Sequence, residues 1–380
     1  MASLGYHEAL IRRGNALHVA HVPTEPARPG GVIVALSFVG VCGTDLQILN
    51  GSRPDTAEIL GHEGLGTIVA AAGQGALSVG EQVVFNPAAQ LSKGRILGHN
   101  TPGLFQKYVT VDAQTVADGL LMPANSCNPL VCGILTEPLG TVVYAHELIS
   151  NAVSNLRTAV VFGGGPVGLL AAIYLDGLGV RVLLVHRTQA RIDTVAKLKI
   201  LSPAAMMLAS DDLAERIMVR NRGRPVDAVL ICTTRAGAPS AVLQAIKMVR
   251  DGGCIDLVTS YPETVRISGA VEASALTAIR SENICGLPEK GSYFFRDISG
   301  RRVAFSSHRG TSHAHLKKAA GALSRGTAAY MRLVTHVLPL QEAAGAIQSL
   351  SEAKSHFVHG TDCIKLVIDL TGPNQAHFRG

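Results

Sequence analysis

The sequence predicts an α/β protein of two domains, one rich in β-strands and one built on a doubly wound parallel sheet. Three observations predict this fold class. The chain has 380 residues, which exceeds the ~250–300 at which a single hydrophobic core stops growing. Short apolar runs punctuated by Gly, Pro and Asn fill residues 1–150. From Asn155 onward, strand-like and helix-like segments alternate, as they do around a parallel sheet.

The individual elements follow from the same patterns. In the β-rich part, strands are expected at residues 31–36, 66–71 and 81–85. In the alternating part, strands are expected at 158–162, 180–185, 227–232 and 253–259, and helices at 166–178, 189–198 and 241–250. Beyond Arg301, the sequence predicts helices at 312–323 and 341–351 and strands at 333–337 and 363–370.

A candidate metal site lies in the β-rich part. The run Gly40-Val41-Cys42-Gly43-Thr44-Asp45 is followed, twenty positions after Cys42, by Gly61-His62-Glu63-Gly64. Thiolate, imidazole and carboxylate are the side chains that hold Zn²⁺ with one coordination position open. Asp45 can orient an imidazole ring, and the Thr44 hydroxyl can pass a proton. A lone Cys or His is usually a packed core residue, but this combination favours metal binding.

A candidate dinucleotide site follows the strand expected at 158–162. The pattern Gly163-x-Gly165-x-x-Gly168, with Pro166 and Val167 inside it, stands between that strand and an expected helix. In this context the glycines allow a tight turn, close approach of the backbone to a pyrophosphate, and packing of the helix on the strand. The pattern alone would be weak, but its position predicts a dinucleotide-binding loop.

The order of these motifs, with Thr136-Glu137-Pro138-Leu139-Gly140 between them, resembles the zinc-dependent medium-chain dehydrogenase/reductase superfamily. The chain is most similar to its polyol branch, with sorbitol dehydrogenase and threonine dehydrogenase as neighbours, from about Arg28 to Leu370. The resemblance implies that residues 1–150 and 306–380 form a GroES-like catalytic domain. It also implies that residues 151–305 form an inserted Rossmann domain.

The resemblance gives Glu137 a role near the metal. The alcohol dehydrogenases carry a third metal-binding cysteine at this position, whereas the polyol relatives carry Glu. That Glu is thought to hold a water at the metal while Glu63 ligates, or to exchange with Glu63. The metal set is therefore Cys42, His62, Glu63 and Glu137, with the permanent third ligand left open. The alternative is a carboxylate at the start of a helix, stabilised by the helix dipole. Cys132 is expected to pack rather than to bind metal.

The chain departs from the resembled family in its second metal site. Most zinc members carry four closely spaced cysteines for a structural zinc, but the stretch from Phe85 to Tyr108 contains no cysteine. We therefore expect one catalytic zinc and no structural zinc. Residues 91–100, which form the corresponding lobe, must be held by packing and hydrogen bonds.

The cofactor is expected to be NADP(H) rather than NAD(H). An acidic residue at the end of the second strand normally binds the adenosine ribose of NAD. Here that position is His186, followed by Arg187 and later by Arg191. Arg187 can meet a 2′-phosphate with charge-assisted hydrogen bonds, although a solvated surface arginine is the simpler alternative.

The combined prediction is a zinc-dependent oxidoreductase that transfers a hydride between NADP(H) and a secondary alcohol or ketone. The resemblance implies a polyol, sugar or cyclitol-like substrate, with Thr44 as the proton relay. Cys42, Thr44, His62, Glu63 and Glu137 are the predicted catalytic residues. The polar residues nearest the motifs are Gln47, Asn50, His99 and Asn100. The alternatives are a zinc-free enone or quinone reductase of the same fold and a non-catalytic NADP(H)-binding protein.

Composition limits the partners. Although the net charge is +6 and the pI about 9.0, no basic run exceeds a pair and aromatics are only 4%. This argues against nucleic acid, for which we expect a concentrated basic footprint. No apolar tract of membrane-spanning length and no signal peptide is evident, and the seven cysteines are scattered. We therefore expect a cytoplasmic protein without a membrane partner. The resemblance implies a homodimer or homotetramer.

Overall fold

The computed structural model describes residues 5–73, 77–124, 128–263, 271–284, 287–288, 293–352 and 356–372. The side chains of residues 131–132 and 287–288 are outside this description, and so are Cys127 and Cys285. The expectation for Cys132 therefore lies outside the described residues. The chain forms two compact units, Met1–Glu137 with Ser312–Gly380, and Pro138–Thr311.

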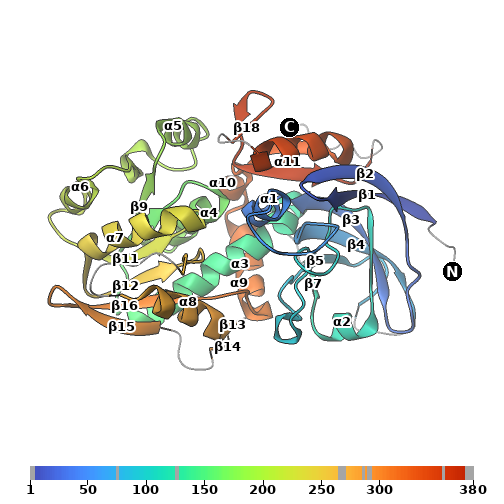
Figure 1. Cartoon of the computed structure of the whole chain (residues 1–380), viewed down its shortest axis with the longest axis horizontal. Coiled ribbons are helices and arrows are strands. Elements are labelled where there is room, and N and C mark those ends of the chain that lie inside the picture. The colour runs from blue at the N-terminus through green and yellow to red at the C-terminus, as the bar shows by residue number, and fades with distance from the viewer. Residues whose placement is uncertain are drawn as a thin grey trace. The chain divides into compact units, whose positions relative to one another are not determined.

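The first unit is built on a seven-stranded sheet (Figure 1). Its strands lie in the order β17 (Val334–Pro339), β20 (Lys365–Asp369), β3 (Val32–Gly40), β4 (Glu63–Ala71), β5 (Gln82–Phe85) and β7 (Leu121–Pro123), with β6 (Tyr108–Val111) also paired to β3. Because β20 pairs antiparallel with β3 and β17 pairs with β20, the end of the chain returns to the sheet that the beginning of the chain starts.

Shorter elements complete the first unit. They are the hairpin β1 (Tyr6–Arg13) and β2 (Ala16–Pro23), α1 (Gly43–Leu49), α2 (Ala113–Ala117), α9 (His313–Arg325), α10 (Thr327–Met331), α11 (Leu340–Glu352), and the hairpin β18 (Phe357–Val358) and β19 (Thr361–Asp362). The core of this unit joins buried side chains of the sheet to the inner face of α11, for example Ile68, Phe85 and Ile347.

One long helix contradicts the interpretation of residues 1–150 as β-rich throughout. Helix α3 spans Pro129–Ala152, 24 residues. It is apolar on most sides, with Ile134, Leu139 and Val142 fully buried, so it lacks the one-sided periodicity that marks a surface helix. Pro138 stands inside α3, at the sequence boundary between the two units.

The second unit contains the expected doubly wound sheet (Figure 1). The strand order is β10 (Met206–Leu208), β9 (Arg181–His186), β8 (Thr158–Phe162), β11 (Val226–Ile231), β12 (Val249–Leu257), β16 (Arg301–Ser307) and β15 (Tyr293–Ile298). The first six strands are parallel, and β15 is antiparallel to β16. The helices are α4 (Pro166–Gly177), α5 (Gln189–Lys197), α6 (Leu213–Arg220), α7 (Ala238–Met248) and α8 (Ala273–Glu282), followed by the short hairpin β13 (Asn283–Ile284) and β14 (Leu287–Pro288).

This architecture confirms the predicted fold class. The parallel strands are buried on both faces, and so they are near-continuous apolar runs, as in Val160, Val161 and Phe162. Among the described residues, none of the helices combines the length and the apolar character needed to cross a bilayer.

Candidate active site

The three candidate metal ligands converge because of strand pairing. Strands β3 and β4 are antiparallel neighbours, and their register places Gly40, at the end of β3, opposite Glu63, at the start of β4. Cys42 follows β3 by two residues as the residue that precedes α1, and His62 stands immediately before β4. One end of one strand pair therefore supplies all three ligands, although twenty residues separate them in sequence.

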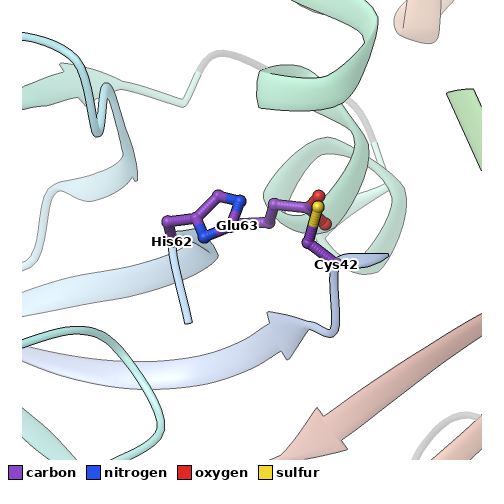
Figure 2. A group of neighbouring side chains, drawn as sticks. All are labelled: Cys42, His62 and Glu63. Carbon is purple, nitrogen blue, oxygen red and sulfur yellow. The ribbon is translucent and has the colours of Figure 1, made fainter. Parts of the chain in front are cut away.

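The geometry of the cluster fits a metal ion. One ligand atom from each of Cys42, His62 and Glu63 lies within 4.8 Å of the others, and the three side chains point toward one another (Figure 2). His62 and Glu63 are 4% and 1% exposed, and Cys42 is half-buried. Sulfur, nitrogen and oxygen donors in one mostly buried pocket are the ligand set of catalytic zinc sites.

Asp45 stabilises the turns that carry Cys42 and His62 through hydrogen bonds to their backbone. Its side chain is fully buried in α1, where it accepts hydrogen bonds from the backbone N–H of Cys42 at 2.8 Å and of Gly61 at 3.1 Å. The Nδ1 atom of His62 lies 3.5 Å from Asp45 Oδ1. Burial acts to raise the pKa of Asp45, but the neighbouring His62 and these hydrogen bonds outweigh it and lower that pKa. Asp45 is thus ionised and positions both ligand-bearing turns.

Lys365 is a functional residue that sequence reasoning missed. Its Nζ atom donates to Oε2 of Glu63 in a short ion pair and to the carbonyl oxygen of Val41 at 3.0 Å. Both charged side chains are 1% exposed. Gly40 makes room for the pair, since a Cβ there would lie 2.7 Å from Glu63 Oε2 and 2.8 Å from Lys365 Cε. The signal in the sequence was a lysine that opens the closing strand, directly before the apolar run of residues 366–368.

Glu137 lies near the cluster but outside the 4.8 Å group. It is the ninth residue of α3, so the alternative that it starts a helix is wrong. Burial raises the pKa of Glu137 to about 7, with His62 lowering this pKa and Glu63 raising it. His62 and Glu63 therefore lie close enough to Glu137 to act electrostatically on its carboxyl group.

The other polar residues near the motifs differ in what their side chains contact. Asn50 donates to the carbonyl of Ser351, and Asn100 holds its own loop through Gly94 and the N–H of Ile96, so both serve the backbone. His99 instead packs its ring against His62, with centroids 5.2 Å apart.

The Nδ1 atom of His99 donates to Asp55 at 3.2 Å. This hydrogen bond fixes which ring nitrogen of His99 carries its proton. Thr44 is half-buried in the first turn of α1, next to Cys42 and Asp45.

The lobe at residues 91–100 is held without cysteines, as expected. Asn100 Nδ2 donates to the carbonyl of Gly94 at 2.7 Å, and Lys93 forms an ion pair with Asp118 at 2.6 Å. Within the lobe, the side chains of Leu91 and Leu97 are buried. Among the described residues, the Cys42 cluster is the only metal-type group found.

The glycine loop of the second unit has the close contacts that its motif requires. Gly163 has φ of 112°, which favours glycine, and a Cβ there would lie 2.5 Å from the carbonyl oxygen of Cys232. A Cβ on Gly168 would lie 1.8 Å from the carbonyl oxygen of Gly163, so only glycine lets α4 pack this closely. Gly165 precedes α4, and Pro166 occupies its first turn.

The residues expected to select the cofactor differ in how far their side chains are exposed. His186 ends β9, and its Nδ1 accepts a hydrogen bond from the N–H of Gly164 at 3.0 Å. Arg191 is 6% exposed and donates to the carbonyl of Gly164 at 3.5 Å. Arg187 is exposed beside them. His186 and Arg191 therefore shape the glycine loop, whereas Arg187 is accessible to a charged group.

Comparisons with known proteins agree with this geometry. A model of the alcohol dehydrogenase GroES-like domain matches residues 28–123. Glucose 1-dehydrogenase of Thermoproteus tenax is 27% identical over 355 residues, which cover 86% of this chain and 90% of that protein. L-threonine 3-dehydrogenase of Bacillus velezensis is 26% identical over 89% of this chain and 94% of that protein.

A solved structure shows the same fold. The alcohol dehydrogenase from Thermotoga maritima matches with a TM-score of 0.72 at 20% identity, over 96% of this chain and 99% of that one. These matches support the resemblance to the zinc-dependent medium-chain dehydrogenase/reductase superfamily and to its polyol and threonine dehydrogenase branch. The chain is accordingly an NAD(P)-dependent dehydrogenase, as the motif order predicted.

Proposed function

We propose that the chain is a zinc-dependent dehydrogenase that transfers a hydride between NADP(H) and a secondary alcohol or ketone of a polyol, sugar or cyclitol-like substrate. The observation that carries this proposal is the buried cluster of Cys42, His62 and Glu63. The named relatives act on glucose and threonine, which are small polar substrates with a secondary alcohol or equivalent group. A homodimer or homotetramer is the assembly we expect.

The metal would be held by Cys42, His62 and Glu63, with Glu137 in exchange with Glu63 or beside it. Zinc in such a site supplies a Lewis acid that makes an alcohol acidic enough to lose its proton near neutral pH. Asp45 orients the imidazole ligand, and Lys365 fixes one oxygen of Glu63. Because Lys365 engages Oε2, the other oxygen of Glu63 is the one available to a metal.

Thr44 would move the proton of the reacting hydroxyl. Its own hydroxyl can accept one hydrogen bond while it donates another, which is the property a relay needs. The position of Thr44 in the first turn of α1, two residues after Cys42, supports this role. The nicotinamide carries the hydride, and the protein contributes orientation and electrostatics.

NADP(H) is favoured because the ribose-binding acid is replaced. His186 is occupied by the N–H of Gly164 and cannot accept from a ribose hydroxyl with the same lone pair. The exposed guanidinium of Arg187 is suited to a 2′-phosphate. His99, held by Asp55 beside His62, is the residue best suited to contact a second hydroxyl group of the substrate.

The test is turnover before and after metal removal. The enzyme should oxidise members of a panel of polyols, sugars and cyclitols with NADP⁺, lose turnover after treatment with a chelator, and regain it when Zn²⁺ is restored. A zinc-free reductase would keep its turnover through chelation. A non-catalytic binding protein would bind NADPH but turn over no alcohol or ketone of the panel.

A further inference from the structure

The amino-terminal edge of the parallel sheet in the second unit gathers an unusual amount of charge. Strands β8, β9, β11, β12 and β16 are parallel, so their first residues lie along one edge. Helices α4, α5, α6 and α7 leave the opposite edge and return, so their carboxyl ends also lie here. We call these strand starts and helix ends the amino edge.

The amino edge carries eleven Lys or Arg side chains against four Asp. The cations are Arg157, Arg181, Lys197, Lys199, Arg220, Arg222, Arg224, Lys247, Arg250, Arg301 and Arg302, and the anions are Asp176, Asp227, Asp251 and Asp297. The difference, +7, exceeds the +6 of the whole chain. The basic residues that look dispersed along the sequence are therefore neighbours in space.

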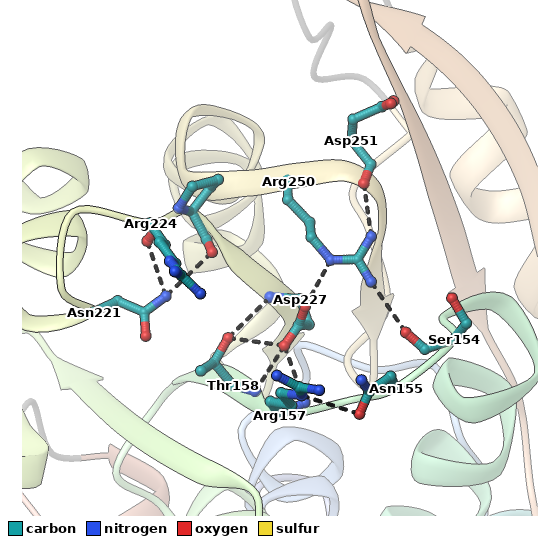
Figure 3. Close-up of polar contacts among 10 residues, drawn as sticks. Ser154, Asn155, Arg157, Thr158, Asn221, Arg224, Asp227, Arg250 and Asp251 are labelled. Carbon is teal, nitrogen blue, oxygen red and sulfur yellow. Dashed lines mark hydrogen bonds and ion pairs between the residues drawn. The ribbon is translucent and has the colours of Figure 1, made fainter.

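Hydrogen bonds connect this row across the sheet. Asp227 accepts from Arg250 Nε at 2.6 Å and from the backbone N–H of Arg157 at 3.0 Å (Figure 3). Asp251 accepts from the backbone N–H of Arg302 at 2.7 Å. Adjacent strands lie ~4.8 Å apart, so the row from β9 to β16 extends over ~20 Å.

Many of these guanidinium groups are already bound to neutral acceptors. Arg181 donates to the carbonyl of Arg220 at 2.6 Å, and Arg301 donates to the carbonyls of Val249 at 2.6 Å and Ile246 at 2.8 Å. Such bonds satisfy the ends of helices and strands without neutralising the cation. The N–H groups of these arginines are less available to hydrogen-bond individual phosphates, but the positive charge of each guanidinium still attracts anions at longer range. The edge thus suits an extended anionic surface more than a nucleic-acid backbone read contact by contact.

Exposed apolar side chains stand at one corner of this edge. Leu178, which follows α4, is 51% exposed, and Val219, near the end of α6, is 78% exposed. The two segments are adjacent because Arg181 bonds to the carbonyl of Arg220. Basic residues around protruding apolar side chains are the combination that binds the interface of an anionic bilayer.

We propose that the amino edge is a peripheral docking surface for membranes that contain anionic lipids. The cations supply long-range attraction to the headgroups, and Leu178 and Val219 insert at the level of the headgroups. The surface lies at the edge of the sheet opposite the glycine loop, so docking leaves the nucleotide end of the strands accessible.

Vesicle flotation with the full chain tests this proposal. The protein should float with vesicles of phosphatidylglycerol mixed with phosphatidylcholine at about 0.15 M ionic strength, and should not float with phosphatidylcholine alone. Binding should weaken as salt is raised. Absence of flotation with the anionic vesicles would overturn the proposal, and so would tighter binding to single-stranded DNA than to the vesicles.

Charge-reversal variants locate the surface. Arg222→Glu with Arg224→Glu changes exposed side chains of the amino edge and should lower the vesicle partition coefficient at least about tenfold. Arg13→Glu with Arg325→Glu makes the same change in net charge on the first unit and should have a much smaller effect. Equal losses in the two pairs would place the binding elsewhere.

A third variant tests the apolar corner. Leu178→Ser with Val219→Ser should reduce flotation while leaving net charge unchanged. Turnover and circular dichroism of each variant in the absence of vesicles should match the unaltered chain, because all these side chains are exposed. If the serine pair floated as well as the unaltered chain, the attraction would be electrostatic only and the insertion step would be wrong.

Discussion

Two ion pairs, one in each unit, differ in burial, and this difference distinguishes a carboxylate suited to bind a metal from one that stabilises the fold. Glu63, a candidate metal ligand, pairs with Lys365, and each of the two side chains is 1% exposed. Asp227 and Arg250 pair at the amino edge of the parallel sheet, 14% and 29% exposed. The partners of the first pair are 302 positions apart in sequence, and those of the second are 23 positions apart. Only the first is removed from water.

The two carboxylates also differ in how much of their hydrogen-bonding capacity is already used. Asp227 accepts hydrogen bonds from Arg250, from the N–H of Arg157 and from both the N–H and hydroxyl of Thr158, so it is fully used in holding the sheet edge (Figure 3). Glu63 is bound by Lys365 through Oε2 and stands within 4.8 Å of two further ligand types. A fully buried charge with spare bonding capacity can serve a metal, whereas a partly exposed one whose hydrogen bonds are all made is structural.

The largest expected effect comes from the hydroxyl of Thr44, two residues after Cys42. Thr44→Val keeps the shape of the side chain but removes the relay, so kcat and kcat/KM should both fall ~10²–10⁴-fold while zinc content is retained. Thr44→Ser should stay active. Arg250→Gln, at the exposed pair, should leave kcat unchanged. Steady-state kinetics of the three variants make the comparison, and a valine variant within about threefold of the unaltered enzyme would move the relay to another group.

Replacing the cation of each ion pair by Met compares how much the two pairs contribute to the stability of the fold. In the chain stripped of zinc, Lys365→Met leaves the carboxylate of Glu63 buried without its cation partner and should cost ~3–5 kcal/mol of stability. Arg250→Met, at the exposed pair, should cost about 1 kcal/mol or less. Urea denaturation measures both. Similar losses would show that burial does not distinguish the two pairs.

A third carboxyl group extends the comparison to the interior of the second unit. Asp256 is fully buried on β12, with one oxygen accepting from the Ser306 hydroxyl at 2.7 Å and the other without a hydrogen-bond partner among the described residues. Burial raises the pKa of Asp256 from 3.8 to about 7. Between these values the folded state keeps a proton that the unfolded chain has lost, so stability falls as pH rises through this window and levels off above it.

Replacing Asp256 tests that pH dependence. Asp256→Asn resembles the protonated acid and cannot ionise. The variant should gain ~2–3 kcal/mol relative to the unaltered chain between about pH 5 and about pH 8. Urea denaturation at the two pH values provides the measurement, and a pH-independent difference would mean that Asp256 does not titrate in this range.

The smallest expected effect concerns the cofactor. The unaltered enzyme should prefer NADP(H) over NAD(H) by at least about tenfold in kcat/KM, equivalent to about 1.4 kcal/mol. Arg187→Ala should remove most of this preference, because its exposed guanidinium is accessible to a 2′-phosphate. Arg222→Ala, an exposed arginine of the amino edge, is the matched control. Equal or better use of NAD(H) by the unaltered enzyme would refute the assignment.

Local signals made most of the second unit predictable. The strand expected at 158–162 is β8 itself, and α4 and α5 begin at the expected residues, because each element carries its own apolar pattern and turn residues. Strand β12 begins four residues earlier than expected, at Val249, because Gly252 and Gly253 resemble a break although the strand passes through them. These glycines lie where the register of β12 against β11 shifts, and a local pattern does not reveal such an irregularity.

The site was predictable only where its residues are close in sequence. Cys42 and His62 belong to short motifs, and the pairing of β3 with β4 brings them together. Lys365 contacts Glu63 across 302 positions, through a pairing of β20 with β3 that no local pattern specifies. The concentration of arginines at the amino edge was hidden for the same reason, since one residue comes from each of several strands and helix ends.

The central claim is that Cys42, His62 and Glu63 hold one catalytic zinc. Elemental analysis of the gently purified chain should return one zinc per chain, and Cys42→Ala should return none. The variant should lose turnover but bind NADPH as before, because the glycine loop belongs to the other unit. Two zincs, or none, in the unaltered chain would contradict the claim, and so would a Cys42→Ala chain that keeps its metal.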